Sequence, residues 1–172
     1  MTHYTRTPSA AVPVDLTDAK DHLRVMHDDE DLAIQRMVLA AAREIEAYAE
    51  IALTRQTISL VVTAEGEGDI ISLPVGPLAP EAEVTVDGVP VTTGISGGRW
   101  PSITLPVGTT GAVAITFEAG FGDTAGSVPD DLALAIMEQA AFAYDSRGAV
   151  DVKPGLVPAA ARIAARYRRV RA

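Results

Sequence analysis

Hydrophobic residues recur three to four positions apart in two long segments of the chain. One segment follows the acidic run Asp28–Asp31, and the other follows Pro129-Asp130-Asp131 and ends near Gly148. This spacing places apolar side chains on one face of a helix, and acids in the first turn meet the positive end of the helix dipole. A proline in the first turn and a glycine just past the end are typical helix boundaries. We predict helices over residues 29–52 and 130–147.

Two shorter helices are predicted near the ends of the chain. The spacing of Leu16 and Leu23 predicts a helix over residues 17–24 whose leucines face the core. Thr17 is its expected N-cap, because a threonine hydroxyl accepts a hydrogen bond from an amide that the first turn leaves open. A stretch rich in alanine and arginine begins at about Pro158 and predicts the last helix.

In the middle of the chain the hydrophobic residues recur at every second position. Ile58, Leu60 and Val62 alternate with more polar positions from Gln56 onward, and short β-branched runs follow as far as Phe117. The pair Asp87-Gly88 stands between two valine strands and predicts a two-residue hairpin, because these residue types tolerate the positive φ of such a turn. Residues 56–117 are therefore predicted to form a small antiparallel β unit.

These elements together indicate an α+β fold. A helical body, made of a short helix, a long helix and two C-terminal helices, carries the β unit as an insertion. The length of 172 residues and the hydrophobic content of 48% favour a single domain with its own core. We expect residues 1–14 to be a flexible arm, residues 15–150 to be the domain, and residues 151–172 to be a linker and a basic helix or tail.

Composition narrows the possible functions. The chain has no cysteine, which excludes disulfides and thiolate metal sites and fits folding in a reducing cytoplasm. No uninterrupted apolar run reaches the roughly 18 residues that would span a membrane. The net charge is −9, but every charged residue after Asp151 is positive. Subtracting those six charges leaves −15 on residues 1–151, which argues against general binding to a phosphate backbone.

Candidate catalytic and metal-binding motifs do not converge on a site. His22, His27 and the acids 28–31 fit neither zinc-site nor EF-hand spacing, and we expect the acids to cap a helix instead. The glycine-rich stretch 94–98 lacks the Lys-Ser/Thr of a phosphate loop, so we expect the tip of a β loop there. All three histidines lie in the first 27 residues, and no GxSxG elbow occurs. We expect no catalytic residue, no metal and no cofactor.

Two features leave a binding role open. Trp100 is the single tryptophan, and it is either a partly buried packing residue or a platform for a sugar or peptide. The arginines at positions 162, 166 and 169 recur at helical spacing and would share one face. Such a face is solvated, binds nucleic acid or docks onto an acidic protein.

The order of segments resembles a known family. The stretch from Asp15 to Val25, the acidic start 28–31 and the helix ending in Arg43-Glu44-Ile45-Glu46-Ala47-Tyr48 look like the opening of the head-tail connector (adaptor) family of long-tailed phages, prophages and gene transfer agents. Later blocks agree in order: Leu73-Pro74 with Pro77-Leu78, Val84-Thr85-Val86-Asp87-Gly88, Phe117-Glu118-Ala119-Gly120-Phe121-Gly122, Val128-Pro129 with Leu132, and Tyr144-Asp145-Ser146-Arg147-Gly148-Ala149-Val150. The resemblance spans residues 15–150.

The resemblance implies a structural virion protein and not an enzyme. Members form a ring, usually of twelve subunits, under the portal protein, where they extend the DNA channel and give tail-side connector, stopper or tail terminator proteins a docking platform. The chain would assemble in the bacterial cytoplasm, reside in the virion neck, touch DNA only as it passes and have no membrane partner. By analogy, the C-terminal segment binds the portal through Arg162, Arg166, Tyr167, Arg168, Arg169 and Arg171.

Two other functions are also compatible with the sequence. The β unit with Trp100 would bind a carbohydrate or peptide at the tail tip or cell surface, and a ligand would then quench the tryptophan fluorescence. A DNA-binding accessory protein would instead use the arginine tail, with an affinity that falls steeply with salt. The acidic body makes the DNA-binding role the weaker of these two.

Overall fold

A computed structural model shows that the chain forms two compact units, where the sequence pattern predicted one domain. The structure describes residues 3–7, 10–66, 68–148 and 155–169. The β unit comprises residues Met1–Ala10 and Glu50–Asp123, and the helical unit comprises Ala11–Ala49 and Thr124–Ala172. Because the β unit enters the chain between two helices of the helical unit, the predicted α+β class with an inserted β unit is confirmed.

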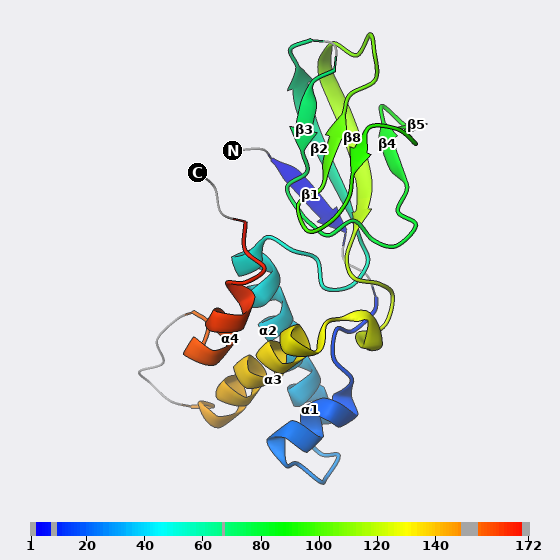
Figure 1. Ribbon diagram of the computed structural model, residues 1–172. Coiled ribbons are helices and arrows are strands. Elements are labelled where there is room, and N and C mark those ends of the chain that lie inside the picture. Colours follow the sequence, from blue (N-terminus) through cyan, green and yellow to red (C-terminus); the bar gives the residue numbers. More distant parts are fainter. Residues whose placement is uncertain (1–2, 8–9, 67, 149–154, 170–172) are drawn as a thin grey trace. The chain divides into compact units, whose positions relative to one another are not determined.

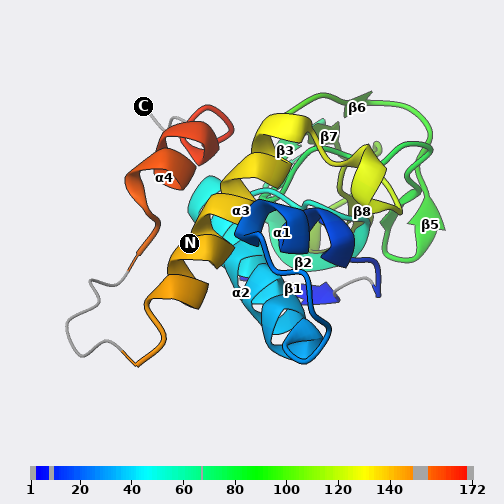
Figure 2. The same cartoon turned by 90° about the horizontal axis from the view of Figure 1, so that it is seen from below.

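The described residues of the helical unit form four packed helices, seen from below in Figure 2: α1 (Leu16–Leu23), α2 (Asp31–Ala49), α3 (Asp130–Asp145) and α4 (Pro158–Ala164). A short 3₁₀ turn, Ala125–Ser127, precedes α3. Helix α3 packs on both α2 and α4, while α1 packs on α2 and α3. Their apolar faces meet in a core that includes Ile34, Val38, Ile45, Leu132, Ile136, Ala160 and Ala164.

The observed ends of α1 and α2 differ from the predicted ones. Helix α1 begins at Leu16 with Asp15 in the N-cap position, and that position makes no side-chain capping bond, so the prediction of Thr17 as the N-cap is wrong. The carbonyl of Asp15 already accepts the first helical bond from the Ala19 amide, at 3.1 Å. Helix α2 ends at Ala49 because Glu50 adopts a left-handed backbone conformation with φ of 57°.

The β unit contains two antiparallel sheets (Figure 1). The larger has the order β1 (Tyr4–Thr7), β2 (Gln56–Ala64), β8 (Gly111–Ala119), β4 (Val84–Val86), β5 (Val89–Pro90), and the smaller has the order β3 (Ile70–Ser72), β7 (Ser102–Thr104), β6 (Ile95–Ser96). Strands β2 and β8 pair over nine residues from Gln56↔Ala119 to Ala64↔Gly111. Their alternate residues are buried with both sheets' apolar side chains in one core, which includes Ile58, Leu60, Val84, Ile103, Ile115 and Phe117.

Strand β1 lies within the stretch that was expected to be a flexible arm. It pairs with β2 in the register Tyr4↔Leu60 to Thr7↔Thr57. Three of its four residues are exposed, so no hydrophobic alternation marks the strand in the sequence. Its order therefore comes from the open hydrogen-bonding edge of β2, a tertiary partner that local sequence does not reveal. Residues 1–2 and 8–9 of that arm lie outside the described residues.

The Asp87-Gly88 hairpin is confirmed. Asp87 and Gly88 have φ values of 51° and 79°, and they join β4 to β5. The Asp87 amide donates to the Ala114 carbonyl at 2.8 Å, and the Asp87 carboxylate accepts from the Ala114 amide at 2.9 Å. The aspartate thus supplies both the turn conformation and a bond to β8.

The acidic run at the start of α2 binds side chains from α1 and from near the end of α3. Lys20 Nζ of α1 lies 2.5 Å from Asp28 Oδ1 and 2.7 Å from Asp31 Oδ1. Glu30 accepts a hydrogen bond from the Tyr144 hydroxyl and pairs with Arg147 Nη1 at 2.5 Å, both near the end of α3. The Tyr144 hydroxyl and the Arg147 guanidinium hold the pKa of Glu30 below its usual value.

Gly120 is a tightly packed backbone position of the β unit with a positive φ. A Cβ atom on it would lie 2.4 Å from the Thr54 carbonyl oxygen, and its φ is 136°. We predict that Gly120→Ala lowers the free energy of unfolding by about 2 kcal/mol or more, through both strain and overlap. Gly97→Ala is the matched control, because a Cβ atom there meets nothing within 4 Å. Urea unfolding of both variants measures the effect, and equal stabilities would contradict it.

The Glu30 contacts predict a pH-dependent contribution to stability. A carboxyl group whose pKa is lowered on folding stabilises the native state above its unfolded pKa, near 4.5, and loses this contribution as the pH falls through the lowered value. We predict that Glu30→Gln lowers Tm at pH 7 and that the difference from the unsubstituted protein shrinks below about pH 4.5. Thermal unfolding between pH 7 and pH 3 tests this, and a Tm difference that is constant across the range would contradict it.

Candidate functional site

The C-terminal segment that was predicted to bind a partner begins with α4. The chain continues past α4 in tight turns, because the amides of Arg166, Tyr167 and Arg168 bond to carbonyls three residues back instead of four. Arg166 and Arg169 therefore lie beyond the helix end and do not share one helical face with Arg162, contrary to the prediction. Of the six predicted partner-binding residues, Arg171 lies outside the described residues.

Helix α4 is held on the helical unit by buried apolar side chains and by a hydrogen bond just before its start. Ala160, Ile163 and Ala164 are buried, and Pro158 occupies the first turn, where its missing amide proton costs no helical hydrogen bond. The amide of Val157 donates to Gln139 Oε1 of α3 at 2.8 Å. Gln139 Nε2 donates in turn to Glu44 Oε2 of α2 at 2.7 Å. The start of α4 is thus fixed to both long helices.

A single aspartate holds the turns that follow α4. The Tyr167 hydroxyl donates to Asp131 Oδ1 of α3 at 2.7 Å, and Arg166 Nη1 lies 3.8 Å from Asp131 Oδ2. Tyr167 is buried, with 9% of its surface exposed. Its burial was not predicted from the sequence, since a tyrosine between arginines gives no hydrophobic period.

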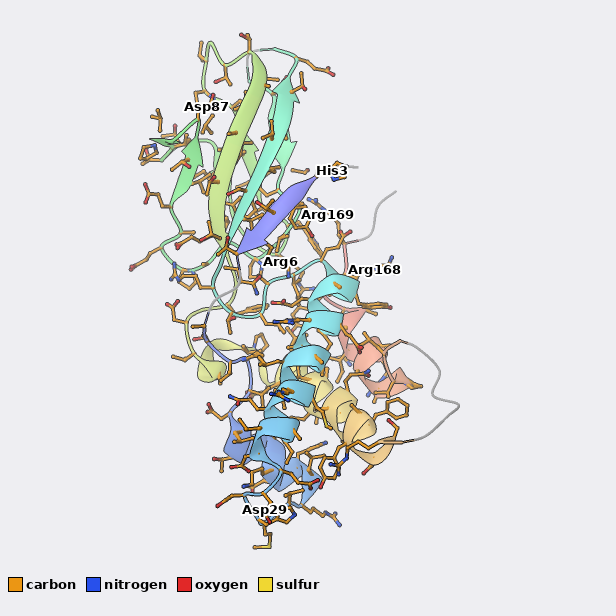
Figure 3. All side chains as sticks on the ribbon, turned by 180° about the vertical axis from the view of Figure 1, so that it is seen from behind. His3, Arg6, Asp29, Asp87, Arg168 and Arg169 are labelled. Atoms are coloured by element: carbon orange, nitrogen blue, oxygen red, sulfur yellow. The ribbon has the colours of Figure 1, made fainter. Side chains whose placement is uncertain are left out.

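The remaining arginines of the segment are arranged around this anchor. Arg162 and Arg168 are exposed and Arg169 is half-buried. The Arg168 guanidinium lies 5.3 Å from the centre of the Tyr48 ring of α2, within the range of a cation–π contact. Figure 3 labels Arg168 and Arg169. Arg162 and Arg168 are therefore exposed to solvent, whereas the aromatic side chain of Tyr167, which lies between them in sequence, is buried.

The other candidate sites lie elsewhere in the described residues. Trp100 is half-buried, and the loop around Gly94–Gly98 contains strand β6 instead of a loop that opens into a helix. Within the described ranges, no group of three or more His, Asp or Glu side chains is placed to hold a metal ion. None of the described helices combines the length and the apolarity needed to cross a membrane.

The chain is similar over its whole length to solved chains of gene transfer agent (GTA) particles. One, from the neck of an empty GTA particle computed with C6 symmetry, is 31% identical, with 100% of this chain and 97% of that chain covered and a TM-score of 0.76. Another, from the virion of a native particle, is 28% identical with a TM-score of 0.75, covering 98% and 96%. A third, from the neck of a native particle computed with C12 symmetry, is 29% identical with a TM-score of 0.72, covering 100% and 97%.

A family model gives the same assignment. The model described as phage gp6-like head-tail connector protein matches residues 13–80, which contain α1, α2 and the first strands that follow them. No curated protein matches the chain. The chain belongs to the phage head-tail connector family, whose members are structural proteins and not enzymes.

Proposed function

We propose that the chain is one subunit of a ring in the neck of a phage-like particle. The ring sits under the portal, extends the DNA channel and gives tail-side connector, stopper or tail terminator proteins a surface on which to dock. The observation that carries the proposal is the full-length likeness to chains from GTA particles, two of them from necks computed with sixfold and twelvefold symmetry. The chain would reside in the virion neck and be made in the bacterial cytoplasm.

The charge of the chain suits a channel through which DNA moves. A net charge of −9 on every subunit creates a negative potential, which grows when copies are arranged in a ring. Such a potential repels phosphate and lowers the affinity of the wall for DNA. DNA would therefore pass without being held.

The C-terminal basic segment is the proposed contact with the portal. Arg162, Arg166 and Arg168 are exposed, so their guanidiniums can reach carboxylates on another protein. The buried Tyr167 keeps the segment in one place, which reduces the entropy lost on docking. Arg169 and Arg171 complete the proposed portal-binding set.

Charge reversal in this segment tests the proposal. We predict that Arg162→Glu/Arg168→Glu lowers the amount of protein that co-sediments with its cognate portal at least about tenfold, because attractive contacts become repulsive. Both side chains are exposed, so the variant should fold normally. Arg162→Lys/Arg168→Lys is the matched control; it keeps both charges and should retain most of the binding.

The outcomes separate two parts of the proposal. If the unsubstituted protein fails to co-sediment with the portal, the connector role in the neck is contradicted. If the charge-reversed variant co-sediments as well as the unsubstituted protein, the ring role stands and the C-terminal segment is not the portal contact. A tryptophan signal that responds to a sugar or peptide, combined with indifference to the portal, would favour a ligand-binding β unit instead.

A further inference from the structure

Two exposed stripes of side chains run along the helical unit with the same residue spacing. The stripe on α2 consists of Leu32, Arg36, Ala40, Arg43 and Ala47, and the stripe on α3 consists of Asp130, Leu134, Glu138, Ala141 and Asp145. All five α2 residues are exposed, and the α3 residues are exposed or half-buried. In both stripes the steps are four, four, three and four residues, which keeps the side chains on one helix face.

The two stripes carry opposite charges. The α2 stripe has Arg36 and Arg43 and no acid, whereas the α3 stripe has three acids and no base. Neither arginine makes an ion pair with any described residue, and the same holds for Asp130 and Asp145. Glu138 Oε1 lies 3.9 Å from His22 Nε2 of α1. Two uncompensated arginines on one helix face are notable in a chain whose net charge is −9.

The stripes lie on opposite sides of the helical unit. Helices α2 and α3 pack against each other, so the faces opposite their buried residues point away from each other. Within the helical unit, α3 is nearer the viewer in Figure 1, and α2 is nearer the viewer in Figure 3, which is turned by 180°. The two stripes therefore cannot meet within one copy of the chain.

Apolar side chains accompany the charges on both faces. Leu32 is 71% exposed on α2, and Leu134 is 41% exposed on α3. Beside the α2 stripe lies an apolar hollow lined by Val12, Val14, Leu16, Gln35, Val38 and Leu39. Exposed apolar area next to a hollow, bordered by charge, is typical of a surface that another protein covers.

We propose that the α2 stripe of one copy packs on the α3 stripe of the next copy. This inference rests on the ring role proposed above and identifies the surfaces that close the ring. A contact between two different faces is heterologous, and repetition of such a contact around an axis generates a closed ring when the rotation fits. Opposite charges on the two faces also disfavour pairing of a stripe with its own kind.

The matched spacing gives the contact a defined register. When the stripes are shifted by one position, Arg43 lies opposite Glu138 whether the helices run parallel or antiparallel, and the residue steps of the two stripes agree throughout when the helices run antiparallel. In the antiparallel case Ala40 lies opposite Ala141, and in the parallel case Ala47 lies opposite Ala141. Each alignment also places the other arginine, Arg36, opposite an aspartate. Small residues at the crossing point allow the helices to approach closely.

Cysteine cross-linking tests the contact directly, because the chain has no cysteine of its own. An Ala141→Cys chain is mixed with an Ala40→Cys chain or an Ala47→Cys chain, the mixture is assembled on the cognate portal, and disulfides are formed by mild oxidation. We expect a heterodimer band from one of the two mixtures, and the one that reacts gives the helix direction. Each single-cysteine chain, assembled alone, is the control. It should give no dimer, because in a contact between two different faces the same cysteine of two copies does not lie opposite itself.

A charge swap gives a second test that does not depend on disulfide geometry. Arg43→Glu alone and Glu138→Arg alone should each lower the yield of assembled ring at least about tenfold, and the double variant should recover it to within about threefold. The matched control pairs Arg43→Glu with Asp21→Arg, an exposed α1 position that restores the net charge without restoring the contact. Equal recovery with this control would overturn the inference.

The results distinguish failure of this contact from failure of the ring role. Rings visible on the portal by electron microscopy, with no cross-link in either mixture and no effect of Arg43→Glu, would overturn the α2–α3 contact and leave the ring role standing. The absence of any ring on the portal would overturn both. Circular dichroism of each variant confirms that a loss of assembly is not a loss of folding.

Discussion

A buried side-chain amide must satisfy its hydrogen bonds within the protein, and the amide of Gln139 links α3 to α2 and to the start of α4. Its nitrogen donates to Glu44 of α2, and its oxygen accepts the amide of Val157, where the chain enters α4. The nitrogen also lies 3.4 Å from the Gly155 carbonyl oxygen, whereas the only described partner of the oxygen is the Val157 amide. The side chain is 6% exposed, so loss of the Val157 bond would leave the oxygen buried without a partner, at a cost of about 1–3 kcal/mol. This amide fixes the point at which the chain enters α4, and Asp131 holds the turns that follow the helix.

The cationic side chains of the helical unit are of two kinds: some form ion pairs within the unit, and others are exposed on its surface. Lys20 and Arg147 neutralise acids of the run before α2 and hold α1 and α3 to its start. Arg36, Arg43 and Arg162 are instead exposed on the surface. A subunit of an assembly needs both kinds of cation. Ion pairs inside the subunit fix its shape, and exposed cations remain available for contacts with partner proteins. The outward cations of an otherwise acidic chain are the natural candidates for docking surfaces.

Sequence patterns were sufficient for features governed by local chemistry. The helical period of α2 and α3, the alternation of β2 and the positive φ of the Asp87-Gly88 turn all depend on nearby residues, and each is found in the structure. Features that depend on remote partners were missed. Strand β1 is ordered by the edge of β2, and Tyr167 is buried because Asp131, 36 residues earlier, accepts its hydroxyl. The prediction that Arg162, Arg166 and Arg169 share one helix face is wrong because α4 ends at Ala164.

The central claim is that copies of this chain form a ring between the head and the tail. Image reconstruction of particles that carry a tagged version of the chain tests it most directly. A closed ring of tagged subunits is expected at the neck and, when the chain is absent, heads that lack attached tails. Complete particles that form without the chain, or a tag located anywhere other than the neck, would contradict the account.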